Sequence, residues 1–167
     1  MNYLDLTDII TGARIYVDGD VCGDDVEFTL PSQTRKTVSY DTIGLEVPIP
    51  GRADSSTLKI HKIGMDGNYY KLCMGGVHVY QLRWVLQYIQ TDGSEKPVGC
   101  YCYVKGRSKG IPESGGKVGD SIDSTIEISP IIIRIVIDGT TYVDIDKLAG
   151  KFKIYGEDEA QNIEALL

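Results

Sequence analysis

Apolar and polar residues alternate along several stretches of the chain, and a period of two residues predicts β-strands rather than helices. In the longest stretch, residues 77–90, one set of alternate positions is apolar, aromatic or histidine: His78, Tyr80, Leu82, Trp84, Leu86 and Tyr88. At ~3.3 Å per residue this strand would be ~45 Å long, and one small core does not cover such a length. Neighbouring chains would have to cover the rest, so the strand predicts an oligomer.

Asp-Gly pairs mark the predicted turns. They occur at 18–19, 66–67, 92–93 and 138–139, and all but the second lie between strand-like runs. Both residue types tolerate the positive φ of a type I′ turn, so these pairs predict β-hairpins. The clearest hairpin joins IIIRIVI (131–137) to TTYVDI (140–145), and Pro130, which cannot donate a ladder hydrogen bond, predicts a break from the strand TIEIS before it.

Helices and loops account for the rest of the chain. Two short helices are expected. The first spans 66–74 and is stopped by the two glycines that follow it, and the second spans 157–166, where acidic residues at its start suit the positive N-terminal end of a helix. Two loops are predicted, at 42–56 with two prolines and no clear period, and at 106–119, which is rich in Gly and Lys. We find no repeat and no linker, so residues 1–167 are expected to form a single, mainly β domain.

Composition and charge narrow the function. The chain has 167 residues, 42% of them hydrophobic and 25% charged, which is typical of a folded globular protein. Its formal net charge of −7 argues against electrostatic binding of nucleic acid, which depends on Lys and Arg. Asp5 and Asp8 interrupt the start where a signal peptide would be basic and then apolar, and the run 131–137 is far shorter than the ~20 residues of a membrane-spanning helix. A soluble protein made in a cytoplasm, with no membrane anchor, is expected.

Candidate chemistry is sparse. His61 and His78 lie in no catalytic or zinc-binding motif, and His78, on the same side as Tyr80, is better explained as a packed or interfacial residue. Cys100 and Cys102 would point the same way from a strand and could hold a metal, but burial as small apolar side chains is favoured. The cysteines are too few and too irregularly spaced for a disulfide framework. We predict no catalytic residue, no cofactor and no metal site.

Five segments follow one another along the chain: RIYVDGD (14–20), FTLPSQTRKTVSY (28–40), LRWVLQY (82–88), VKGRSKGIPESGGKVGDS (104–121) and IRIVIDGTTYVDID (133–146). The block TLP, followed by TRK and a tyrosine, is the most specific of them. On these segments, which span nearly the whole chain, the protein resembles the tail tube family of contractile-tailed phages and of phage-tail-like particles such as contractile bacteriocins.

The resemblance implies a small β-barrel or sandwich with a flanking helix and a long β-hairpin that lines a lumen. It implies a structural subunit, not an enzyme, that forms hexameric rings; the rings stack into a hollow tube, which a contracting sheath drives through the target envelope. The implied partners are further copies of the chain, a sheath protein, a tape measure protein, a baseplate or tube initiator and a tail terminator. The subunit would assemble in the bacterial cytoplasm and end in the particle tail. Its acidic balance fits a lumen that DNA passes without specific binding.

Alternation and resemblance together assign roles to individual residues. The lumen-facing set is Gln81, Arg83 and Gln87. The core set is Tyr80, Leu82, Trp84, Leu86, Ile133 and Ile135. The set expected to contact other subunits or rings is Arg35, Lys36, Glu46, Arg52, Lys105, Arg107 and Lys109. The loop 42–56 and the N-terminal arm are expected to reach the adjacent ring, and the loop 106–119 to lie at a ring face.

Two alternatives stay open at this stage. One is a tube component of another contractile injection system, of the type VI secretion kind or an extracellular toxin particle. The other is a monomeric β-barrel that binds a ligand, or a small hydrolase, in which the long hairpin would form the wall of a private pocket.

Overall fold

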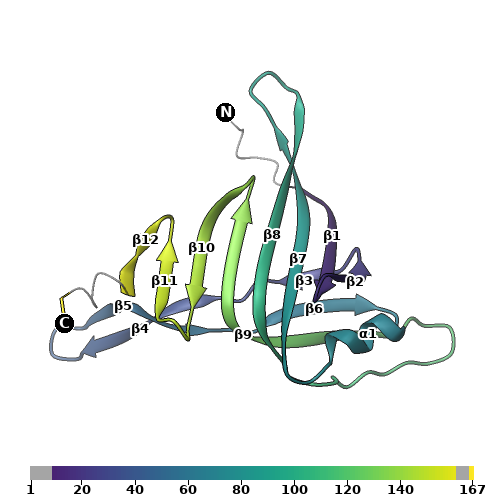
Figure 1. Cartoon of the computed structure of the whole chain (residues 1–167), viewed down its shortest axis with the longest axis horizontal. Helices are drawn as coiled ribbons and strands as arrows, with labels where there is room; N and C mark the ends of the chain where they lie inside the picture. The colour runs from purple at the N-terminus through teal and green to yellow at the C-terminus, as the bar shows by residue number, and fades with distance from the viewer. Residues whose placement is uncertain (1–8, 161–165) are drawn as a thin grey trace.

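The computed structural model describes residues 9–160 and 166–167, which form strands β1–β12 and helix α1 (Figure 1). The elements are β1 (Ile9–Val17), β2 (Asp20–Asp24), β3 (Glu27–Thr29), β4 (Gln33–Tyr40), β5 (Leu45–Ser55), β6 (Leu58–Ile63), α1 (Gly67–Leu72), β7 (Val77–Ile89), β8 (Glu95–Ser108), β9 (Asp123–Ile137), β10 (Thr140–Asp146), β11 (Lys151–Ile154) and β12 (Glu157–Asp158). The prediction of a mainly β fold is confirmed.

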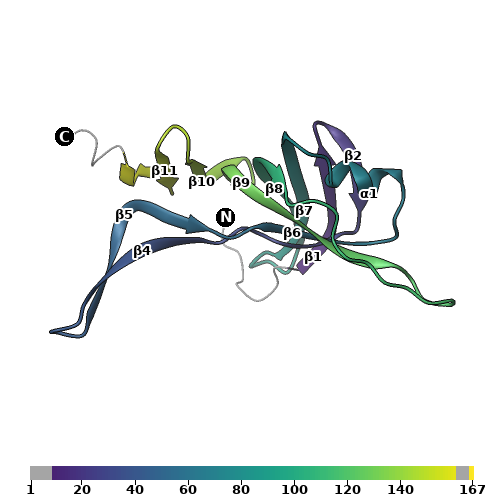
Figure 2. The same ribbon diagram turned by 90° about the horizontal axis from the view of Figure 1, so that it is seen from below.

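Strand β9 builds both layers of the fold. Its second half lies between β8 and β10 in the main layer, where the strand order is β12-β11-β10-β9-β8-β7-β1-β2. Its first half, residues 123–128, pairs instead with β6, which pairs in turn with β3. The two views show β9 running under the main layer and then turning up into it (Figures 1 and 2). The result is sandwich-like, and the main layer ends in β2 and β12 without closing into a barrel.

The hydrophobic core fills the space between the layers. The main layer contributes Tyr80, Leu82 and Trp84 from β7, together with the inward side chains of β1 and β8. The second layer contributes apolar side chains of β6 and of the first half of β9, and the Phe28 ring of β3 lies 5.2 Å from the Trp84 ring. Helix α1 closes one end with its buried Tyr69 and Leu72 side chains.

The predicted turns and the first predicted helix are confirmed. Asp18 and Asp138 adopt positive φ angles of 49° and 50°, each followed by a glycine that does the same, as a type I′ hairpin turn requires. Asp66 caps helix α1, because its carboxylate accepts a hydrogen bond of 3.0 Å from the Tyr69 N–H. In the described part of the chain, no helix is long and apolar enough to cross a membrane.

The loop predicted at 42–56 is wrong, because most of it is strand β5. This strand pairs with β4 alone, in a two-stranded sheet that projects from the body of the molecule (Figure 2). Pro48 and Pro50 are tolerated there because one edge of β5 needs no donors for a further strand. We call this hairpin, residues 33–55, the arm.

Three other expectations need correction. Pro130 does not end a strand, because β9 runs through it. One edge of β9 pairs with β8, and on its other edge Pro130 marks the change of partner from β6 to β10. Of the loop predicted at 106–119, residues 106–108 belong to β8, and the irregular connection follows them. The helix predicted at 157–166 begins instead as β12 at Glu157–Asp158, and its residues 161–165 lie outside the described residues.

Gly106 allows the close approach of β8 and β9 at this bend. A Cβ atom at this position would lie 2.1 Å from the Ser129 carbonyl oxygen and 3.1 Å from the Pro130 Cα, and both are backbone atoms. We expect Gly106→Ala to lower the free energy of unfolding by about 3 kcal/mol, because the two strands must separate locally. Urea unfolding of the isolated subunit measures this change.

Gly99→Ala is the matched control. Gly99 lies in the same strand, and a Cβ there would meet nothing within 4 Å, so we expect a change below about 1 kcal/mol. Equal losses in the two variants would show that the strands do not approach closely at Gly106.

Candidate assembly surfaces

The β7–β8 hairpin presents two chemically different faces. Its inward face carries Tyr80, Leu82 and Trp84, which are buried in the core. Of the other three members of the predicted core set, Leu86 of β7 and Ile135 of β9 are partly buried and pack against the core cluster, and Ile133 of β9 is fully buried. The opposite face carries Gln81, Arg83 and Gln87. We call this opposite face of β1, β7, β8 and the second half of β9 the outer face.

The outer face is basic, although the whole chain is acidic. Residues directly opposite one another in an antiparallel pair share a face, so the register places Arg14 and Tyr101 on either side of Arg83, and Arg134 beside Tyr103. Further along β8 the same face carries Lys105 and Arg107. The surplus of acidic side chains expected at the predicted lumen therefore lies on other surfaces.

Neighbouring side chains hold several of these cations in place. The Arg83 guanidinium lies 4.5 Å from the centre of the Tyr16 ring and donates a 2.9 Å hydrogen bond to the Gln81 side chain. Arg14 pairs with Asp24 of β2, and Arg134 lies 3.7 Å from the Asp144 carboxylate. Arginine over a tyrosine ring adds a cation–π attraction of about 0.5–1 kcal/mol at an exposed position. The outer face is thus a row of partly engaged basic and aromatic groups.

The arm has one apolar face that none of the described residues covers. Val38 lies opposite Val47, and Tyr40 opposite Leu45, so these four side chains share a face; all of them are exposed. Ile43 in the turn is 72% exposed. An isolated two-stranded hairpin is marginally stable in water, and an exposed apolar strip on it is typical of an interaction site.

The C-terminal end of the described chain anchors the base of the arm. Glu159 accepts hydrogen bonds from the Arg35 guanidinium and from the Gly51 N–H, the latter at 3.0 Å. Arg35 also lies 5.7 Å from the centre of the Phe152 ring. These donors, Arg35 first, lower the pKa of Glu159. Of the predicted contact residues, Arg35 is therefore engaged within its own subunit.

The remaining predicted contact residues fall into three places. Lys36 and Arg52 lie near the base of the arm, and Glu46 lies near its tip, where it accepts a 2.6 Å hydrogen bond from Thr37. Lys105 and Arg107 lie on the outer face. Lys109 follows β8 and lies 3.6 Å from the Glu127 carboxylate on the second layer. The structure thus does not gather this set into one patch.

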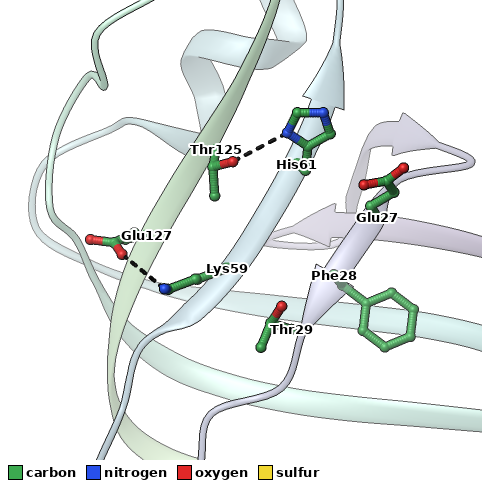
Figure 3. A pocket seen from close by; sticks show the side chains of 7 residues that line it. All are labelled: Glu27, Phe28, Thr29, Lys59, His61, Thr125 and Glu127. Atoms are coloured by element: carbon green, nitrogen blue, oxygen red, sulfur yellow. Dashed lines mark hydrogen bonds and ion pairs between the residues drawn. The ribbon is translucent and has the colours of Figure 1, made fainter.

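An open polar hollow of about 530 Å³ lies on the second layer (Figure 3). Most of its charged groups have partners within the subunit: Lys59 lies 3.7 Å from Glu127, and His61 lies 3.2 Å from the Thr125 hydroxyl and 3.4 Å from the Asp123 carboxylate. Glu27 also lines the hollow and forms no ion pair with a described residue. Exposed pairs of this kind contribute little free energy, and one exposed carboxylate does not make a ligand site. Among the described residues, no group of three His, Cys, Asp or Glu side chains could hold a metal ion.

Cys100 and Cys102 point into the core, opposite Trp84 and Leu82. Burial raises the pKa of Cys102 to about 12. These thiols behave as small apolar side chains.

His78 joins the β1–β2 turn to the segment after α1. Its Nδ1 lies 2.8 Å from an Asp18 carboxylate oxygen and its Nε2 lies 2.8 Å from the Gly75 carbonyl oxygen. Both neighbours are acceptors, so the protonated ring donates a hydrogen bond from each of its nitrogens. Asp18 also accepts a 3.0 Å hydrogen bond from the Val79 N–H. The pKa of His78 is raised, mainly by its hydrogen bond to Asp18 and to a smaller extent by that to the Gly75 carbonyl group. The pKa of Asp18 is lowered, mainly by the hydrogen bond from the Val79 N–H and to a smaller extent by that from His78.

Sequence reasoning missed the arm and its anchor. The alternation of Val38 with Tyr40 and of Leu45 with Val47, on either side of a turn, was the available signal for the arm. Nothing in the sequence pairs Arg35 with Glu159, which lies 124 residues away.

Comparisons with known proteins agree with the geometry. Residues 7–167 match the model of the family described as phage tail tube protein FII. The chain is also similar to the tail tube protein of Escherichia phage P2, with 28% identity over 139 residues, which are 80% of each chain.

Leu82 and Arg83 are neighbours on opposite faces of β7 and allow a direct test of the face assignment. Leu82 is fully buried, so we expect Leu82→Ala to lower the free energy of unfolding by about 3 kcal/mol. Arg83→Ala loses an exposed cation–π contact, so we expect a loss of about 1 kcal/mol or less. Urea unfolding measures both, and similar losses would contradict the assignment.

The His78 bridge predicts a pH dependence of stability. The pKa of His78 in the folded chain lies above its ordinary value of 6.5, so the stabilisation is complete below pH 6.5 and is lost as the pH rises through the folded pKa. The pKa of Asp18 lies below its ordinary 3.8, so its contribution is present above that pH and is lost as the pH falls through the folded value. We expect the melting temperature of the wild type to fall more than that of His78→Gln between about pH 6 and pH 9. Asp18→Asn should flatten the curve in the same range, and an unchanged slope in both variants would contradict the bridge.

Proposed function

The chain belongs to the phage tail tube protein FII family, and from this membership and its exposed surfaces we propose that it is the inner-tube subunit of a contractile phage tail or phage-tail-like bacteriocin. The family is structural, not enzymatic. In the proposal, hexameric rings of the subunit stack into a hollow tube, and a sheath around the tube contracts and drives it through the target envelope.

The open main layer is the observation that carries the proposal. It ends in β2 on one side and in β12 on the other, and within the described residues neither strand has a partner on its far edge. A strand edge presents unpaired N–H and C=O groups, which favour pairing with another chain. Because β2 and β12 lie at opposite ends of one layer, a head-to-tail contact between copies would use both and could close a ring.

The outer face is the proposed lumen wall, with Gln81, Arg83 and Gln87 among its side chains. Such a wall would be basic and aromatic rather than acidic. Several of its cations already have partners in the subunit, Arg14 with Asp24 and Arg134 with Asp144, and this limits the phosphate contacts that would retain DNA. DNA would therefore pass without specific binding.

The arm is the proposed contact to the adjacent ring, a role that we extend to the N-terminal residues. The apolar face of the arm and its anchored base support this role, because the base fixes the direction in which the free end points. The irregular connection 109–122 is proposed to lie at a ring face.

The remaining partners follow from the proposed place in the particle. The tube would contact a sheath protein on its outside, a tape measure protein inside, an initiator at the baseplate and a terminator at the other end. Assembly would take place in the bacterial cytoplasm, before the tube becomes part of the particle tail.

Cysteine labelling of assembled tubes tests the lumen wall. In a background of Cys73→Ser, which leaves only buried native thiols, Gln81→Cys should react with a bulky polyethylene-glycol maleimide in dissociated subunits. In tubes with closed ends the reaction should fall to the level of the Cys73→Ser background, because the reagent cannot enter the lumen. Lys59→Cys on the second layer is the control and should react in both states.

Electron microscopy of the same samples must show rings or tubes. Compact monomers under every condition, also with sheath protein present, would overturn the proposed function. Tubes in which Gln81→Cys reacts as fast as Lys59→Cys would keep the tube but reject this face as its inner wall.

A further inference from the structure

A cleft of about 310 Å³ lies between the base of the arm and strands β10 and β11. Its floor is apolar, because Ile145 and Phe152 line it with only 3% and 4% of their surfaces exposed. Its rim is mainly basic and carries Lys36, Arg52, Lys147 and Lys151 beside one carboxylate, Asp146. Lys36 pairs with Asp54 and Lys151 with Asp144, whereas Arg52 and Lys147 form no ion pair with any described residue. Lys147 is an exposed residue, and the partial burial of its side chain lowers its pKa. A cleft with this lining suits an occupant that is both apolar and acidic.

Gln33 lines the cleft as well, and its side-chain carbonyl oxygen accepts a 2.6 Å hydrogen bond from the Ser55 hydroxyl. Its Nε2 atom is buried and has no hydrogen-bond partner among the described residues. Because the subunit's own atoms cover this nitrogen, it is not a contact for an occupant of the cleft.

The free end of the arm has the complementary chemistry. Tyr40, Ile43 and Leu45 expose their apolar side chains there, and Asp41 and Glu46 supply carboxylates. The arm cannot fold back into its own cleft, because the eight residues of β4 place its tip ~26 Å from its base.

We propose that the tip of the arm of one subunit docks in the cleft at the base of the arm of another copy of this chain. This inference rests on the proposed function and names the surface that receives the arm. The contact is head-to-tail: each subunit offers a tip and a cleft, so the contact can repeat from copy to copy. The apolar floor supplies affinity and the basic rim selects the acidic tip.

A charge exchange tests the docking. Lys147→Glu places a carboxylate opposite Asp41 and Glu46, and we expect it to raise the protein concentration needed for tube assembly by about tenfold or more. Asp41→Lys added to Lys147→Glu restores opposite charges and should return that concentration toward the wild-type value. Asp120→Lys, an equal charge change in the connection 109–122, should not rescue Lys147→Glu. Sedimentation over a concentration series measures assembly, and circular dichroism checks that each variant folds.

A disulfide test locates the contact independently of charge. With Cys73→Ser as background, Ile43→Cys combined with Ala53→Cys should form a disulfide between subunits on oxidation, seen as linked chains on a non-reducing gel. Either single cysteine should give no such ladder. Mapping of the bond to Ile43 and Ala53 of different chains supports the docking.

The outcomes separate this inference from the proposed function. If the wild type forms tubes but Lys147→Glu assembles normally and the cysteine pair does not link, the tip docks elsewhere and the tube stands. A link from Ile43→Cys to another segment, found with a cysteine scan, has the same meaning. If the wild type forms neither rings nor tubes, both the docking and the proposed function are overturned.

Discussion

The bend in β9 at Pro130 is the constraint on which the rest of the structure depends. Before the bend the strand pairs with β6 and after it with β10, so a single strand supplies both layers of the fold. Proline removes one ladder donor at the point where the partner changes, and Gly106 opposite it leaves room for the Ser129 carbonyl group. Only because the second layer turns under the first do Tyr80, Leu82 and Trp84 find a cover. Without it the longest hairpin of the protein would expose its apolar face.

The same construction leaves the arm outside the core. The arm begins two residues after Pro31 and ends three residues before the first residue of β6, so the second layer holds only its base. Glu159 adds a second attachment there through Arg35 and the Gly51 N–H. This hairpin is fixed at its base, so its direction is defined, but the apolar side chains at its tip have no cover within the described residues. This combination favours binding to another chain over folding back, and it makes the isolated subunit a part of a larger structure.

Sequence reasoning succeeded where a local rule decides the outcome. The alternation around Trp84 and the Asp-Gly turns at 18–19 and 138–139 follow from side-chain direction and backbone sterics, and the structure has them as predicted. It failed at Pro130 and in β5, where proline was interpreted as a break. All three prolines, Pro130 in β9 and Pro48 and Pro50 in β5, are tolerated because the strand lacks a partner on one edge at that point, and this depends on the tertiary arrangement. The clustering of Lys36, Arg52 and Lys147 likewise depends on the distance between the arm and β10, which no local pattern contains.

The distribution of charge bears directly on how identical acidic subunits can associate. With a net charge of −7, two copies repel each other at long range, and salt screens this repulsion over a Debye length of about 8–10 Å. Attraction must therefore come from surfaces whose local charge differs from the negative net charge of the whole subunit. The outer face and the arm cleft are such surfaces, because they concentrate basic groups, whereas the arm tip carries acidic ones. Contacts between unlike surfaces are therefore favoured, and contacts between like surfaces are disfavoured. A head-to-tail arrangement, in which each copy uses one surface of each kind, meets this condition and is the arrangement that gives rings or filaments.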